Sequence, residues 1–193
     1  MYGYIESDLR GVSEYVAPKT TLPSKYDMKN QMDSPCDQGN RGICVSVCVS
    51  NMCDYLFRGQ GKRWQNGLDY FYNKRQYKNI DGMSPRDAFE IAQKDNFIKS
   101  FAKVGNIDSV KHAILANGPV LIALPVYNTA RDNFWEKYHG EDCTGGHAVT
   151  LVGFDNKGFA LRNSWGVTYG DNGYGFFPFD NLKDVLEAWT III

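Results

Sequence analysis

The chain has 193 residues, of which 43% are hydrophobic and 22% are charged, and its formal net charge at pH 7 is -1. That length allows one sizeable hydrophobic core, or two lobes that share an interface. A nearly neutral chain offers no basic surface for nucleic acid or for an anionic membrane, so we expect neither as a partner. No apolar stretch approaches the length that spans a bilayer.

Residues 1–21 are predicted to form an extended N-terminal arm, because their periodicity is weak and residues 18–21 (Pro-Lys-Thr-Thr) break any regular structure. The start of the chain lacks the basic and apolar regions of a secretory signal. We therefore expect either a cytoplasmic or other intracellular location, or a chain from which an export signal has been removed. The arm either packs along the rest of the chain as a stabilising strap, or crosses the functional site and restrains it. We favour the strap.

A glycine-bearing turn, residues 37–44, leads into a dense apolar run that ends at Arg58-Gly59, and residues 44–58 are predicted to form a largely buried helix. Cys44 then lies in the first turn, where free N–H groups and the helix dipole favour a thiolate. This stretch alone is equally compatible with an ordinary core cysteine. The five cysteines contain no CxxC pair and match no common zinc site, so no metal is expected.

The remaining elements predict an α+β fold, with helices mainly in residues 22–106 and strands mainly in residues 107–193. Ser84 and Pro85 have the residue types of an N-cap and of the first position of a helix. Further helices are expected at residues 68–77, 108–117 and 180–187, and strands at residues 120–126, 147–154, 158–162, 173–177 and 188–193.

Two later segments contribute a histidine and an asparagine. Residues 145–154 place His147 at the start of a strand-like run, and residues 161–166 place Asn163 just before Ser-Trp-Gly. A cysteine at a helix start, followed far downstream by a histidine and an asparagine on neighbouring strands, is the Cys–His–Asn arrangement for acyl transfer.

These segments resemble the papain family of cysteine peptidases. Its Gln-Gly-x-x-Gly-x-Cys, Gly-His-Ala and Asn-Ser-Trp-Gly signatures occur here in the family's order, and the resemblance runs from about residue 22 to the C-terminus. It implies one peptidase domain, residues 22–193, with a helical N-terminal lobe, a β-barrel-like C-terminal lobe and the active site in the cleft between them. It also implies a peptide or protein substrate and no cofactor. The arm is too short for the helical prosegment of lysosomal relatives.

The resemblance gives each signature residue a role. Cys44 would be the nucleophile and His147 the acid and base, with Asn163 orienting the imidazole. The Gln38 side-chain amide and the Cys44 backbone N–H would form the oxyanion hole. Trp165 would cover the bond between His147 and Asn163 and exclude water, or would simply be a large core residue.

Three further residues are expected to contact substrate. Gly82 and Met83 occupy the place of the family's glycine-rich groove turn, where a bare backbone can pair with an extended peptide. An ordinary helix-entry turn would explain them equally well. Gly146, next to His147, would leave the other wall of the groove open.

The chain departs from the family in ways that bear on specificity. His147 follows Cys44 by 103 residues (147 minus 44), whereas about 130–150 is usual. Val45 and Tyr169 stand where the family has tryptophan. Arg41 replaces a cysteine that secreted members bridge, which favours a reducing compartment or a fold stable without that bridge.

The same groups could transfer an acyl group to another acceptor, or hydrolyse a non-peptide amide. A third alternative is a binding or structural component of a larger assembly, such as a virion. For a peptidase, the sulfur, imidazole and carboxamide should converge at the junction of the two halves, with the sulfur open to solvent.

Overall fold

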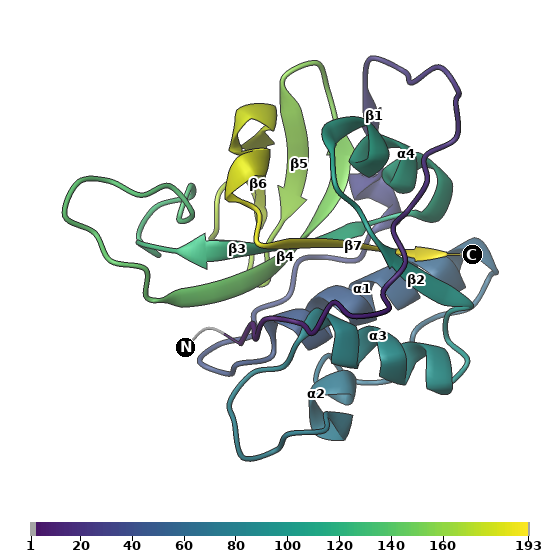
Figure 1. The fold of residues 1–193 in the computed structure, drawn as a ribbon, viewed down its shortest axis with the longest axis horizontal. Coiled ribbons are helices and arrows are strands. Elements are labelled where there is room, and N and C mark those ends of the chain that lie inside the picture. The colour runs from purple at the N-terminus through teal and green to yellow at the C-terminus, as the bar shows by residue number, and fades with distance from the viewer. Residues whose placement is uncertain (1–2, 193) are drawn as a thin grey trace.

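The computed structural model describes residues 3–192, which form a layer of helices packed against an antiparallel sheet (Figure 1). The helical layer contains α1 (Cys44–Gly59), α2 (Tyr70–Lys74) and α3 (Pro85–Lys94). A fourth helix, α4 (Ile107–Asn117), packs against the sheet. Two short 3-10 helices, η1 (Lys29–Gln31) and η2 (Phe179–Asp184), connect other elements.

Helix α1 is the centre of the helical layer, as the sequence predicts. Ten of its 16 residues are buried, and it packs against α2, α3 and strand β4 (Gly145–Phe154). Among residues 3–192 no side chain caps its first turn: the N-cap is Ile43, which has no side-chain hydrogen-bonding group. The N–H groups of this turn are therefore free to serve other partners.

Local capping explains where two other helices begin. The Ser84 hydroxyl accepts the Asp87 N–H at 3.2 Å and Pro85 opens α3, so the predicted N-cap is confirmed. At α4 the Asn106 side chain accepts the Ser109 N–H at 2.9 Å. That cap was not predicted.

The sheet has the strand order β2-β7-β3-β4-β5-β6, and β1 pairs with β4. The strands are β1 (Tyr26–Asp27), β2 (Ser100–Lys103), β3 (Val120–Val126), β4, β5 (Gly158–Arg162), β6 (Tyr174–Pro178) and β7 (Glu187–Ile192). No pairing among the described residues joins the edges β2 and β6, so the sheet of this β-barrel-like lobe is not closed. Strand β2 was not predicted, and it pairs with β7 although it precedes the predicted lobe boundary.

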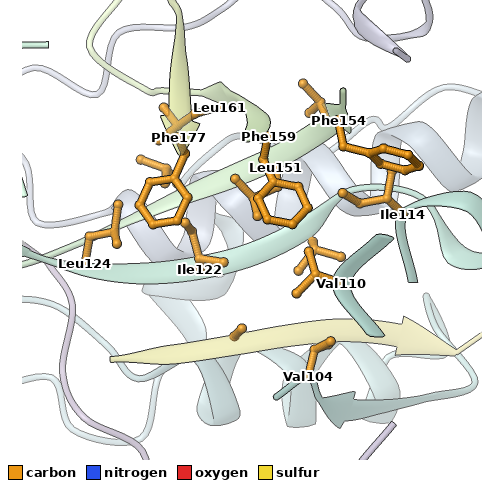
Figure 2. Close-up of a cluster of buried hydrophobic side chains, with 14 of the residues drawn as sticks. Val104, Val110, Ile114, Ile122, Leu124, Leu151, Phe154, Phe159, Leu161 and Phe177 are labelled. Atoms are coloured by element: carbon orange, nitrogen blue, oxygen red, sulfur yellow. The ribbon is translucent and has the colours of Figure 1, made fainter. Parts of the chain in front are cut away.

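Apolar side chains from the sheet and α4 form the core of the second lobe (Figure 2). The side chains of Phe154, Phe159 and Phe177 are almost completely buried in it, with aliphatic residues of β3, β4 and β5. A separate cluster of buried side chains lies between α1, α3 and the start of β4. The catalytic candidates lie at the edge of this second cluster, where helix meets sheet.

The N-terminal arm has two parts. Residues 7–15 follow the helical lobe and β2 as a strap: the Tyr15 N–H donates to the Lys103 carbonyl at 2.7 Å, and the Arg86 guanidinium donates to the carbonyls of Asp8 and Arg10. Residues 3–5 instead pass between the helical layer and the sheet (Figure 1). The strap interpretation therefore holds only for the later part of the arm.

Among the described residues, no helix is both long and apolar enough to cross a membrane. All five cysteines are free thiols, and within residues 3–192 no group of His, Cys, Asp and Glu side chains has the arrangement of a metal site.

Candidate active site

Cys44 is the first residue of α1, and its side chain is completely buried. The backbone N–H groups of Ala148 on β4 and of Gly3 in the arm lie near its sulfur and favour the thiolate. Burial raises the pKa of the thiol, and these N–H groups only partly offset that effect. In this arrangement Cys44 is a protonated thiol in contact with the strand that carries His147.

His147 is the third residue of β4 and Asn163 directly follows β5, so the pairing of these two strands brings the side chains together. The His147 Nε2 lies 2.7 Å from the Asn163 Oδ1, which also accepts the Ser164 backbone N–H at 2.8 Å. Because Oδ1 can only accept, Nε2 carries the proton. Nδ1 is left as the basic nitrogen, and it is buried with no hydrogen-bond partner among the described residues.

Aromatic rings enclose the imidazole. Trp165 stacks on His147 with ring centroids 4.7 Å apart and an interplanar angle of 24°, and Phe134 contacts it edge-on at 5.4 Å. Trp165 thus lies where the sequence predicts a cover for the bond between His147 and Asn163. Phe134 was missed, because it belongs to an irregular segment in which no periodicity marks it as buried. Burial lowers the pKa of His147 to about 4, against a smaller opposing effect of Asn163.

We expect this shift to make stability depend on pH. The unfolded imidazole takes up a proton near its ordinary pKa of 6.5, while the folded one resists until about 4. The unfolded state therefore binds more protons between these values, and the free energy of unfolding falls as the pH is lowered from 6.5 to 4, by up to about 3 kcal/mol. Urea denaturation across this range should show the decrease in the wild type and a smaller one in His147→Gln. Equal decreases in both proteins would contradict the assignment.

Gln38 is held in one orientation by hydrogen bonds from both ends of its side-chain amide. Its Oε1 accepts the Ser164 hydroxyl at 2.5 Å, and its Nε2 donates to the Arg41 carbonyl at 2.9 Å. Its backbone N–H donates to the Ser164 carbonyl at 2.8 Å. The amide group therefore points into the turn that precedes Cys44, and its second N–H has no partner among the described residues and can donate elsewhere. Ser164 links this residue to the neighbour Asn163, a role that sequence reasoning missed.

Two of the three predicted substrate-contacting residues, Met83 and Gly146, are hydrogen bonded to the chain's own arm, and the third, Gly82, lies against it. The Ile5 N–H donates to the Met83 carbonyl at 3.1 Å, and the Met83 N–H donates to the Gly3 carbonyl at 2.8 Å. On the other side the Tyr4 N–H donates to the Gly146 carbonyl at 3.3 Å. We call the channel between residues 82–83 and residue 146 the groove. Residues 3–5 lie in it as an added extended strand.

Two glycines make this close approach possible. A Cβ atom on Gly82, whose φ is +101°, would lie 2.6 Å from the Gly3 carbonyl oxygen. A Cβ atom on Gly146 would lie 2.2 Å from the Tyr4 ring. Any larger residue at either position would collide with the arm in its present path.

The expected solvent access of the sulfur is wrong for this state of the molecule. Cys44 and His147 both have no exposed surface, because the arm and the aromatic rings cover them. Within residues 3–192 the thiol also makes no hydrogen bond to His147. The fold nevertheless brings the two elements into contact, since α1, which begins at Cys44, packs against β4, which carries His147.

Sequence comparison shows which known proteins this chain is similar to. The family model described as papain family cysteine protease matches residues 11–181. A peptidase C1-like protein of Acanthamoeba polyphaga mimivirus is 32% identical over 129 residues, covering 55% of this chain and 41% of that protein. Human cathepsin O is 27% identical over 169 residues, covering 77% of this chain and 46% of that protein. The chain spans less than half the length of these relatives.

Solved structures show the same fold. Xylellain, a cysteine protease from Xylella fastidiosa, superposes with a TM-score of 0.83 at 22% identity, covering 98% of this chain and 95% of that one. Procathepsin B from Trypanosoma congolense superposes with a TM-score of 0.79 at 13% identity, covering 100% and 87%. The predicted α+β, papain-like architecture is confirmed.

Proposed function

Because the chain belongs to the papain family of cysteine proteases, we propose that it is an endopeptidase that uses Cys44, His147 and Asn163. The observation that carries this proposal is the extended segment in the groove, which rests on Cys44 and pairs with both walls. A substrate peptide would take the same place. The arm continues beyond residue 5 along the helical lobe, so the groove admits a segment from within a longer chain.

In the first half of the reaction, the His147 Nδ1 takes the proton of the Cys44 thiol and the sulfur attacks the substrate carbonyl carbon. The oxyanion that forms receives hydrogen bonds from the Cys44 N–H and from the free N–H of Gln38. His147 then gives its proton to the leaving nitrogen, the C–N bond breaks, and a thioester remains. In the second half, a water molecule gives a proton to His147 and attacks the carbonyl carbon of the thioester. The C–S bond then breaks and the Cys44 sulfur leaves.

The state with the arm in the groove does not support this chemistry. Burial raises the pKa of Cys44 and lowers that of His147, so both effects disfavour the thiolate–imidazolium pair. Removing residues 3–5 would admit water to both groups and relieve both shifts. We therefore propose that the arm restrains the enzyme and has to leave the groove before a substrate binds.

The test is hydrolysis of fluorogenic peptides by a chain that begins at Glu6, which keeps the strap and lacks the groove segment. Three backbone hydrogen bonds and the Tyr4 contacts hold the segment, and each is worth about 1 kcal/mol net. We expect turnover to rise by about tenfold to a hundredfold. Tyr4→Ala in the full chain should give part of this increase. Val16→Ala, which changes an exposed arm residue, should give none.

If hydrolysis is no faster without residues 1–5, the proposal that the arm restrains the enzyme is overturned, and the peptidase assignment is left intact. A complete lack of thiol-dependent hydrolysis in both chains would overturn the assignment itself.

A further inference from the structure

A small pocket lies where the helical layer meets the sheet, and none of its lining residues belongs to the groove or to the catalytic candidates. Its volume is about 180 Å³. Ser50 of α1 and Trp64 in the loop after α1 line it from the helical side, and Cys36 lines it from the chain before α1. Arg162, the last residue of β5, lines it from the sheet. A molecule bound in this pocket would therefore contact both lobes.

Three of the residues that line the pocket carry a buried hydrogen-bond donor without a partner. These donors are the Ser50 hydroxyl, the Trp64 indole N–H and the Arg162 Nε–H, and none of them has a hydrogen-bond partner among the described residues. Ser50 is only 1% exposed and Arg162 only 2%. Buried polar groups in proteins are almost always paired. Three unpaired donors at one pocket therefore point to a ligand that accepts hydrogen bonds.

Arg162 is also a buried cation without a carboxylate partner. Its guanidinium donates to the backbone carbonyls of Asp33 and Ser34 at 2.6 and 3.1 Å, and to the Tyr174 hydroxyl at 3.0 Å. Within residues 3–192 it forms no ion pair. Neutral acceptors compensate only part of the cost of burying a charge. A neutral ligand would satisfy the donors but leave this charge unbalanced, so the pocket favours an anion.

Two carboxylates at the pocket limit how much negative charge it accepts. The Asp54 carboxylate is held by Arg58, whose Nε donates to it at 2.7 Å, and the same guanidinium forms an ion pair with Asp33. The Asp33 side chain is 58% exposed, so water screens the charge that Arg58 does not balance. One negative charge on the ligand balances Arg162, and a second would be repelled by these two groups.

We propose that this pocket binds a small carboxylate of single charge. The two oxygens of a carboxylate can together accept hydrogen bonds from Ser50, Trp64 and Arg162, and its charge balances the buried guanidinium. A dianion such as sulfate fits less well, because its second charge would face Asp33 and Asp54. Binding at this pocket needs no turnover, so the proposal does not depend on the peptidase function.

The test uses Cys36, which lines the same pocket, as a reporter in the full-length chain. Iodoacetate and iodoacetamide both alkylate a thiol and release iodide, but only iodoacetate carries a carboxylate. The rate constant for iodoacetate divided by that for iodoacetamide should be at least about tenfold larger at Cys36 than at the exposed Cys143, because bound iodoacetate is held beside the Cys36 thiol. Peptide mass spectrometry measures both residues in the same sample. Equal ratios at Cys36 and Cys143 would overturn the proposal.

Two small changes each remove one of the donors. Ser50→Ala removes the hydroxyl and Trp64→Phe removes the indole N–H, and each should lower the Cys36 ratio by about threefold to tenfold through the loss of one hydrogen bond to the carboxylate. Ser46→Ala is the matched control, because Ser46 is also buried on α1 but its hydroxyl already donates to the Leu68 carbonyl at 2.8 Å. It should leave the ratio unchanged. Unchanged ratios in both donor variants would contradict a carboxylate at this position.

Thermal denaturation gives a second readout that does not depend on Cys36. Sodium acetate in place of sodium chloride, at constant ionic strength, should raise the unfolding temperature of the wild type and of Ser46→Ala by equal amounts, and that of Ser50→Ala by less. Sodium sulfate should raise all three equally, because it stabilises proteins by exclusion from their surface. An equal effect of acetate on all three chains would overturn the proposal. A sulfate effect that Ser50→Ala reduces more than it reduces the acetate effect would overturn the choice of a singly charged ligand.

Discussion

Cys44→Ala is expected to lower kcat by about four orders of magnitude or more in the chain that begins at Glu6. Loss of a catalytic nucleophile commonly has an effect of this size, because the residual activity comes only from binding and the oxyanion hole. The measurement is peptide hydrolysis with the enzyme at high concentration, compared with a blank.

Cys53→Ala is the matched control, since Cys53 is a second fully buried cysteine on the same helix. Its removal should affect stability rather than catalysis. Residual activity of Cys44→Ala within tenfold of the parent chain would rule out a Cys44 nucleophile. Thermal denaturation of both variants would show whether either change acts through unfolding.

Gln38→Ala should lower kcat by about two to three orders of magnitude, with a much smaller effect on KM. The side-chain amide is already fixed by Ser164 and Arg41, so it can stabilise the oxyanion without reorganising, and such donors act mainly in the transition state. Gln93→Ala is the comparison, because the Gln93 amide also donates to a backbone carbonyl but lies on the exposed face of α3. It should leave kcat unchanged. A Gln38→Ala variant that changes only KM would assign Gln38 to binding.

The parts of the fold that depend on local residues could be predicted from the sequence. Ser84 and Pro85 mark a helix start by their own chemistry, and the apolar run from Cys44 marks a buried helix by its density. Strand β2 could not be found this way. It is only four residues long, and its partner β7 lies near the far end of the chain, so no local pattern indicates the pairing.

The same distinction applies to the site. The motifs predicted that His147 and Asn163 would meet, and the strand register brings them to 2.7 Å. The contact of Tyr4 with Glu187 joins residues 183 positions apart, and no motif contains either residue. The burial of Cys44 was missed for a related reason: it depends on where a short irregular arm lies, which its own sequence hardly constrains.

The most direct test of the arm-covered cysteine site is the rate at which an epoxide thiol trap labels Cys44, with the labelled residue identified by peptide mass spectrometry. The full-length chain and the chain that begins at Glu6 would be compared at pH 7. We predict labelling at Cys44 alone among the buried cysteines, at least about tenfold faster in the shorter chain, and abolished by His147→Ala. Equal labelling rates in the two chains, or modification of Cys48 or Cys53 in place of Cys44, would contradict the account.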